Sequence, residues 1–498
     1  MNYWSLLTNK SNTHQAFWVA MGSFSSFALA IVSAAILSRY FDKTEYGTYR
    51  QILYVYNTLL VIFTAGLPKV FAYYLPRYNL AQGKDIVWKI SRILFLLGLV
   101  FSAFLFTCSG LIADLLRNPE LSKGLKYFSP IPMLLLPTLG IEGIFSTYKK
   151  TIFIAIYNTL SRLLMLLFIV LPVIIFRGSY LYAIYGWLAV SVITLMIAYF
   201  FKSIPFAGVI TEKSSLKIKE IFLYSVPLAF ASAAGIAIKS ADQFYISRYF
   251  GTDVFAEFSN GFVELPFAHM ITGAVSTVLM PVFSKMIHDK TDTNILGDLW
   301  KSSLLKSATL IYPMVVFFMF FPREVMTILY SSKYVESSGY FVIAMTINFF
   351  NVIVFAPLIF SLGETRFYAR LHIWIAVAAW VLSYFLVIIF KSAIAIAVFS
   401  AFRSISIIII ALIFTSKRLN TKFIELFPAL RLLRIGLHSL TIAIVVKLIA
   451  DHFLYSFSSW LIFVFSALSF ALLLILSSRI FGIDYLHIVR TFLKNETK

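Results

Sequence analysis

The tetrapeptide Ser-Arg-Tyr-Phe at residues 38–41 closes the first long apolar run of the chain and recurs, 209 residues later, at residues 247–250. The residues that follow keep this register, since Tyr46-Gly47 aligns with Phe255-Ala256. A segment repeated at the same place in two series of apolar runs indicates an internal duplication. The chain is therefore expected to contain two copies of one unit.

The composition places the chain in a lipid bilayer. Of its 498 residues, 60% are hydrophobic and 13% are charged, against the roughly 25% charged residues of soluble domains. A soluble or disordered protein is excluded, because a soluble fold of this size could not hide so much apolar surface. The apolar stretches are continuous, which excludes a membrane β-barrel. The net charge of +20 is spread thinly over apolar sequence, which argues against nucleic acid as a partner.

Segments of about 20 apolar residues predict about fourteen transmembrane helices. The predicted spans are 16–38, 47–67, 91–112, 127–146, 152–175, 180–201, 221–246, 254–282, 304–321, 339–362, 371–390, 392–414, 435–450 and 458–478. We interpret the basic segment 202–219 as a cytoplasmic linker and 417–434 as a basic cytoplasmic loop. These boundaries give an amino-terminal lobe at 1–201, a carboxy-terminal lobe at 220–416, and a final helix pair with its tail at 435–498.

This plan predicts an all-α integral membrane protein with two pseudo-symmetric six-helix lobes and a carboxy-terminal helix pair. Because six is even, both copies have the same orientation, and parallel repeats of this kind surround a central cavity with a substrate site near the bilayer midplane. Most of the 42 lysines and arginines fall on one side when the amino terminus is placed in the cytoplasm. Both termini are therefore predicted to be cytoplasmic.

Three short motifs and the span plan resemble a known family. The motifs are the tetrapeptide at 38–41, Tyr46-Gly47-Thr48-Tyr49, and Gly66-Leu67-Pro68 at the far end of the second span. Together they resemble the Wzx-type polysaccharide-biosynthesis flippases of the multidrug/oligosaccharidyl-lipid/polysaccharide exporter superfamily, over essentially the whole chain. The resemblance implies a V-shaped transporter of the bacterial inner membrane that works by alternating access. It implies as substrate a polyprenyl-pyrophosphate-linked oligosaccharide for lipopolysaccharide O-antigen or capsule, moved from the cytoplasmic to the outer leaflet, with membrane lipid as a partner.

Ionisable residues inside spans are the best functional candidates, because each is costly in a bilayer unless it is solvated or paired. Cations within spans are assigned to the pyrophosphate, which a guanidinium binds with two hydrogen bonds. These substrate-binding candidates are Arg50, Arg162, Lys239 and Arg403. Two carboxylates are assigned to coupling with H⁺ or Na⁺, namely Asp242 and Glu264.

A purely structural interpretation stands beside several of these assignments. Lys239 and Asp242 lie three residues apart on one face of a helix, which also fits a pair that neutralises itself. Arg50 also fits a solvated helix end, and Arg403 also fits an arginine that donates to a nearby carbonyl group. Lys447, in the peripheral thirteenth span, is expected to extend its ammonium to the membrane interface.

Three classes of function remain open. The first is the lipid-linked oligosaccharide flippase. The second, a cation-coupled multidrug or metabolite exporter of the same superfamily, is disfavoured by the extra pair of spans after Arg434. The third, a membrane polysaccharide polymerase or glycosyltransferase, is disfavoured by the short predicted loops. The sequence has no P-loop and no zinc motif, so no enzymatic activity, cofactor or metal is expected.

Overall fold

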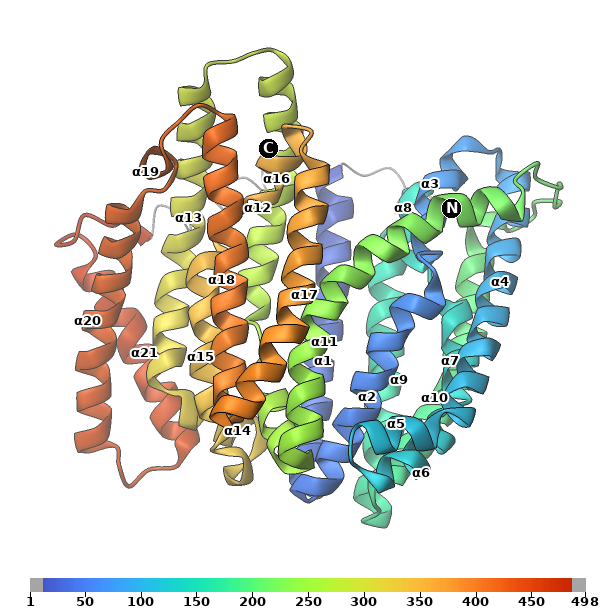
Figure 1. Ribbon diagram of the computed structural model, residues 1–498, viewed down its shortest axis with the longest axis horizontal. Helices are drawn as coiled ribbons and strands as arrows, with labels where there is room; N and C mark the ends of the chain where they lie inside the picture. The colour runs from blue at the N-terminus through green and yellow to red at the C-terminus, as the bar shows by residue number, and fades with distance from the viewer. Residues whose placement is uncertain (1–11, 486–498) are drawn as a thin grey trace, which may run out of the picture. The chain divides into compact units, whose positions relative to one another are not determined.

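The computed structural model describes residues 12–485, and every regular element in that range is a helix (Figure 1). Its contacts divide the chain into two compact units, Met1–Ala256 and Glu257–Lys498. The long helices of the amino-terminal unit are α1 (Asn12–Tyr40), α2 (Lys43–Thr64), α4 (Leu80–Thr107), α9 (Ile152–Phe176), α10 (Tyr180–Ser203) and α11 (Ile218–Gly261), whose last residues belong to the other unit. Its short elements are α3 (Pro68–Tyr74), η2 (Leu75–Arg77), α5 (Ser109–Leu115), α6 (Pro119–Phe128), α7 (Ile131–Leu135), η3 (Leu136–Thr138), α8 (Ile141–Thr147) and η4 (Ile204–Phe206).

The carboxy-terminal unit is built in the same manner from long and short helices. Its long helices are α12 (Pro266–His288), α13 (Thr293–Phe320), α15 (Ser337–Asn351), α17 (Thr365–Phe390), α18 (Ala393–Arg418), α20 (Ala429–Phe453) and α21 (Ser459–Ser477). Its short elements are α14 (Pro322–Tyr330), η5 (Ser332–Tyr334), α16 (Ala356–Ser361) and α19 (Phe423–Leu426).

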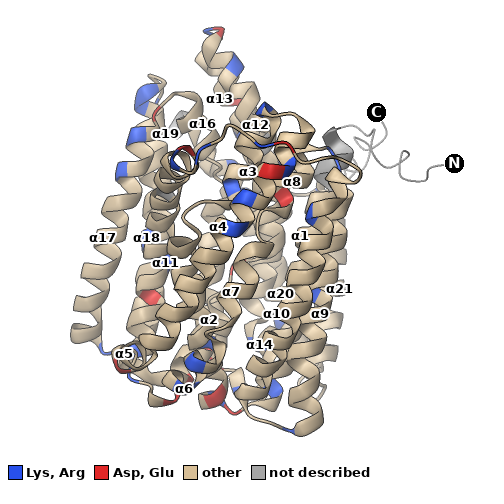
Figure 2. Ribbon diagram, turned by 90° about the vertical axis from the view of Figure 1, so that its right-hand side faces the viewer, with Lys and Arg blue, Asp and Glu red and all other residues tan. Residues whose placement is uncertain are grey.

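The all-α membrane class predicted from the sequence is confirmed. Within the described residues, 13 segments are long and apolar enough to cross a membrane. Figure 2 shows Lys, Arg, Asp and Glu concentrated toward the ends of the long helices, with long uncharged stretches between them. The segment missing from the predicted set is 339–362, where the prediction of one continuous helix is wrong. Residues 352–355 are not helical, and a new helix starts at Ala356 with Pro357 in its first turn, a position that proline favours because it cannot continue a preceding helix.

Helix breaks occur in corresponding spans of the two predicted repeats. In the second span, Ala65 (φ 47°) and Gly66 (φ 70°) separate α2 from α3. The fourth span is divided into α6, α7, η3 and α8. The eighth is divided between the end of α11, beyond its non-helical Gly251 (φ 85°), and α12, which Pro266 opens. The second, fourth, eighth and tenth spans are therefore all discontinuous. Because broken backbone is tolerated at membrane depth only where protein or water covers it, these breaks mark interior faces of the bundles.

One hydrogen bond joins residues that the predicted repeat makes equivalent. The Thr44 hydroxyl donates to Asp253 Oδ1 at 2.8 Å, and the two residues are 209 positions apart, as the tetrapeptides are. The duplication itself stays a prediction. The predicted lobe boundary at 202–219 stays a prediction, since the compact units divide after Ala256 instead.

The last two long helices are packed into the carboxy-terminal unit. Phe317 and Phe321 of the α13–α14 region form a buried cluster with Val446 of α20 and Phe470 of α21. His438 joins α20 to the end of α21, because Ser477 Oγ lies 2.9 Å from its Nε2. The final helix pair therefore shares the core of this unit.

Lys447, which the sequence predicts to extend its ammonium to the membrane interface, forms two ion pairs, and its place at the interface stays a prediction. Its Nζ lies 3.4 Å from Glu324 Oε1 of α14 and 3.0 Å from Asp451 Oδ1, one turn along α20. The Glu324 side chain is 12% exposed, whereas that of Asp451 is 61% exposed. The fold therefore supplies a half-buried ion pair where the sequence offered only a charge in an apolar helix.

We expect Glu324→Gln to lower the stability of the protein by about 1–2 kcal/mol, since it leaves Lys447 with a single, exposed partner. Asp451→Asn is the matched control, because it removes the exposed partner of the same lysine, and its cost is expected to stay below about 1 kcal/mol. Thermal unfolding of both variants in detergent measures the difference. A larger loss for Asp451→Asn than for Glu324→Gln would contradict the assignment of Glu324 as the principal partner.

Candidate substrate and ion-coupling site

Polar side chains join α2 to α11 in the amino-terminal unit. The Tyr54 hydroxyl donates to the Ser240 carbonyl at 3.2 Å, and the Thr58 and Ser240 hydroxyls lie 2.9 Å apart. Farther along, Gln51 Nε2 donates to Ser247 Oγ at 2.7 Å. We call these five residues the α2–α11 seam. Hydroxyls and amides at a helix contact within a membrane satisfy one another, which fixes the register of the two helices.

The seam places Lys239 and Asp242 next to α2. Lys239 directly precedes Ser240 on α11, and Asp242 follows it by two residues. Asp242 is 3% exposed, whereas Lys239 is exposed. Asp242 also lies near Tyr54 of the seam. The structure therefore gives the two candidates different surroundings, a buried carboxylate against a polar seam and an exposed cation one turn away. Arg50, the candidate on α2 itself, is half-buried.

Arg162 lies near the middle of α9 with its side chain exposed. The ionisable residues near its guanidinium are Tyr56 and Tyr157, both 8% exposed. Its Nη1 lies 3.9 Å from the Met165 sulfur. Within residues 12–485 no carboxylate pairs with it. Arg162 is thus a cation at membrane depth, beside packed tyrosines, whose charge the described part of the protein does not neutralise.

The remaining two candidates belong to the carboxy-terminal unit. Arg403 of α18 is 3% exposed, its Nη2 donates to Ser400 Oγ at 3.0 Å, and its guanidinium lies 5.6 Å from the Phe399 ring centroid. Glu264 is exposed, in the non-helical residues 262–265 between α11 and α12. The expectation that Glu264 lies inside a continuous eighth helix is therefore wrong, because the chain restarts at Pro266. The roles assigned to both residues stay predictions.

Lys202 was missed as a candidate, because it was placed at the start of the cytoplasmic linker. It lies in the last turn of α10, its side chain is fully buried, and its Nζ donates to the Pro137 carbonyl and to Ser91 Oγ. The sequence carried one indication of this placement. Lys202 follows the apolar run at 180–201 directly, and the helix-ending Pro205 comes three residues later.

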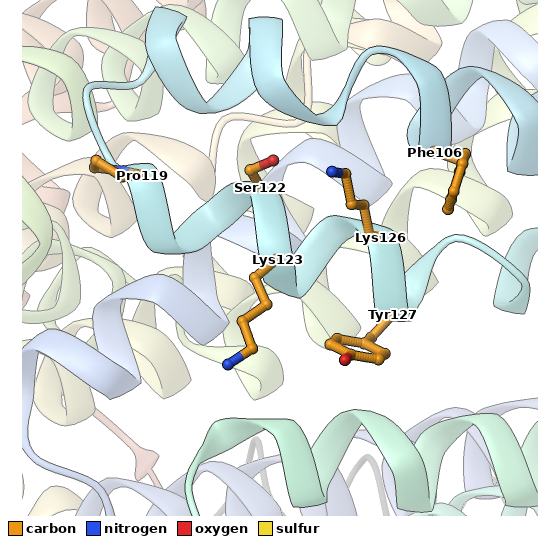
Figure 3. Close-up of a pocket in the computed structure, with 6 residues that line it drawn as sticks. All are labelled: Phe106, Pro119, Ser122, Lys123, Lys126 and Tyr127. Atoms are coloured by element: carbon orange, nitrogen blue, oxygen red, sulfur yellow. The ribbon is translucent and has the colours of Figure 1, made fainter.

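A cavity of about 530 Å³ lies against α6, and Figure 3 shows its lining. Lys123, Lys126, Ser122 and Tyr127 project from α6 around it, and Phe106 of α4 borders it. None of the six predicted site residues lines this cavity. A second cavity, of about 590 Å³, lies between α13 and α20 and is lined almost entirely by apolar side chains, among them Phe320 and Leu433.

The comparisons with known proteins agree with this architecture. The lipid II flippase MurJ, solved in an inward closed conformation, matches with a TM-score of 0.70 and 17% identity over 93% of this chain and 98% of that chain. A MOP-superfamily transporter from Pyrococcus furiosus, described as having a binding pocket of reverse polarity, matches with a TM-score of 0.57 and 12% identity over 82% of this chain and 95% of that chain. An inward-facing multidrug-resistance transporter of the MATE family also matches, with a TM-score of 0.57 and 12% identity over 81% and 94% of the two chains. No curated protein matches this chain.

These likenesses establish the fold as that of the MOP-superfamily transporters. The family of polysaccharide biosynthesis proteins matches residues 36–339, which is more than half of the chain and includes both tetrapeptides. The resemblance read from the sequence motifs is thereby confirmed. This chain belongs to the polysaccharide biosynthesis protein family.

Proposed function

We propose that the protein is a flippase that carries a polyprenyl-pyrophosphate-linked oligosaccharide from the cytoplasmic to the outer leaflet by alternating access. The observation that carries the proposal is Arg162, an exposed cation in the middle of a membrane span with no carboxylate partner among the described residues. Such a charge is costly in a membrane unless an anion or water meets it. A pyrophosphate supplies two or more negative charges and accepts bidentate hydrogen bonds from a guanidinium.

The other assigned residues complete the proposal. Arg50 and Lys239 add positive charge for the headgroup, and Arg403 contributes in a state that uncovers it. The apolar cavity between α13 and α20 suits an isoprenoid chain, because hydrocarbon gains by leaving water for such a lining. Asp242 and Glu264 take up and release H⁺ or Na⁺ as the protein changes state. Both termini face the cytoplasm of a bacterial inner membrane, and the product feeds a surface polysaccharide such as O-antigen or capsule.

A cation-coupled exporter is the second candidate, favoured by the buried carboxylate Asp242 and by the likeness to a MATE transporter. Coverage favours the flippase. The match to MurJ extends over 93% of this chain, whereas the match to the MATE structure extends over 81% of it. The MATE structure is itself 94% covered, so this chain has residues for which that structure has no counterpart. The part of this chain beyond a MATE-sized core is therefore shared with the flippase fold.

The test is the leaflet distribution of the lipid-linked oligosaccharide in cells depleted of this protein, in a strain without a redundant flippase. An impermeant label that reacts with outer-leaflet sugar separates the two pools. We expect the intermediate to accumulate on the cytoplasmic face and to be relieved by the wild-type protein. An unchanged distribution would refute the flippase function, and drug-efflux assays would then test the exporter.

A further inference from the structure

The fourth span of the amino-terminal unit contains a break that leaves a carbonyl group without its helical donor. Leu139 has an extended backbone and Gly140 has φ 90°, so that α8 starts afresh at Ile141. In a continuous helix, the Pro137 carbonyl would accept from the amide of residue 141, four positions on. The break removes that donor. Pro137 is buried, so another group must satisfy the carbonyl oxygen.

Lys202 supplies the missing donor. Its Nζ donates to the Pro137 carbonyl oxygen at 2.6 Å and to Ser91 Oγ of α4 at 3.0 Å. The same Nζ lies 5.2 Å from the ring centroid of Phe71 in α3, within the range of a cation–π contact. Lys202 and Phe71 are both 0% exposed, and Ser91 is 1% exposed. A side chain from α10 thus reaches three other elements of the same unit.

The surroundings of Lys202 match an ammonium group. An ammonium has three N–H donors and no acceptor, and the structure presents two oxygens and one aromatic face. Within the described residues no carboxylate pairs with it. An ion that is buried without a counter-ion is costly, so it is retained only where every donor is satisfied.

The aromatic face is itself fixed by the break. A Cβ atom on Gly140 would lie 2.1 Å from Phe71 Cε2, so the ring occupies the space that any other residue at 140 would fill. Phe71 belongs to α3, which follows the break in the second span. Phe71 therefore connects two spans: its backbone belongs to α3 of the second span, and its ring edge lies against Gly140 at the break of the fourth span. Lys202 lies over the face of the same ring.

We propose that Lys202 is a positioning residue of the transport cycle, whose buried ammonium ties both broken spans of the amino-terminal unit to α4 and α10 so that they move as one body. The proposal rests on the proposed transport function. Alternating access moves helix bundles against one another as rigid bodies, and a loose break within a bundle would absorb that motion locally. By closing the break, Lys202 transmits the movement of α10 to α3 and η3 without touching the substrate.

The test compares Lys202→Met and Lys202→Arg in full-length protein reconstituted in proteoliposomes. The probe is a fluorescent polyprenyl-pyrophosphate sugar, whose leaflet is reported by dithionite quenching. Methionine keeps a linear chain but has no donor, and arginine keeps cationic donors. For Lys202→Met we expect the maximal rate to fall about tenfold while the probe concentration at half-maximal rate stays within about twofold, because a conformational step and not binding is affected. Lys202→Arg is expected to recover part of the rate.

Hydrogen exchange provides a measurement that does not depend on transport. Amides of residues 138–144 are expected to exchange about tenfold faster in Lys202→Met, since the break is no longer tied. Lys84→Met is the matched control, because Lys84 on α4 also donates to a backbone carbonyl, that of Val209 at 2.7 Å, away from the break. Lys84→Met should change neither the maximal transport rate nor the amide exchange of residues 138–144. If Lys202→Met does not fold, Ser91→Ala is measured instead, and a smaller change of the same kind is expected.

The outcomes separate the two proposals. If the amides of residues 138–144 exchange at the wild-type rate in Lys202→Met, the claim that Lys202 holds the break is overturned. Faster exchange with an unchanged maximal rate overturns the positioning role while leaving the flippase function intact. If the wild-type protein does not move the probe at all, the flippase function fails, and exchange at 138–144 still decides whether Lys202 holds the break.

Discussion

Arg162→Ala is expected to lower the rate of substrate translocation about 10- to 100-fold, which corresponds to the loss of about 1.5–3 kcal/mol from charge-assisted hydrogen bonds. The guanidinium is exposed in the middle of α9, and within residues 12–485 it has no carboxylate that would compete with a pyrophosphate. Arg162→Lys keeps the charge but loses the bidentate geometry, so an intermediate rate is expected. The measurement is relief of the cytoplasmic accumulation in depleted cells, with protein levels matched by immunoblot.

Arg177→Asn is the matched control for Arg162. It removes a cation from the end of the same helix, where Arg177 has φ 45°, and asparagine tolerates this left-handed conformation. Translocation should remain at the wild-type level. Full activity of Arg162→Ala would keep the flippase function but exclude Arg162 as an essential substrate contact. Equal losses in both variants would show that the loss comes from the net charge of α9 and not from one site.

Gly186→Ala is expected to destabilise the folded protein by about 1–3 kcal/mol, the usual cost of overpacking a close contact. Gly186 lies in α10, where a Cβ atom would stand 1.8 Å from the carbonyl oxygen of Phe168 in α9. Backbone cannot yield as the end of a side chain can, so the two helices must separate. Alanine favours a helix over glycine by about 1 kcal/mol, so a loss of stability identifies the contact as its cause.

Gly235→Ala provides the control, because Gly235 is also helical and a Cβ atom there meets nothing within 4 Å in its own unit. We expect this variant to unfold at or slightly above the wild-type temperature. Thermal unfolding in detergent, followed by size-exclusion chromatography, compares the two. Gly186→Ala unfolding at the temperature of Gly235→Ala would mean that α9 and α10 are not in close contact.

The spans were predictable because hydropathy is a local property. A run of apolar residues must leave water whatever its neighbours are, so thirteen of the predicted spans have helical counterparts. The motifs around 38–49 were equally local and led to the right family. The helix breaks could be predicted from the sequence only in part. Pro266 and Pro357 were visible in the sequence, but a proline in a membrane helix produces either a kink or a complete break, and the packing around it decides which.

The candidate site was predicted in part for the same reason. Counting charges within apolar runs finds Arg162, and the structure leaves that side chain exposed. The same count also selects Arg403, but the fold buries that side chain against Ser400 and Phe399. It passed over Lys202, which lies one residue beyond the predicted end of its span.

The sequence by itself determined that this protein is a bundle of membrane helices of the polysaccharide biosynthesis protein family, because burial in lipid depends on each segment's own composition. The tertiary structure alone decided the state of each charge. Lys202 meets Pro137 and Ser91, 65 and 111 residues away, and Lys447 meets Glu324, 123 residues away. The free energy of a buried ion depends on the few atoms around it, and only the folded chain brings those atoms together.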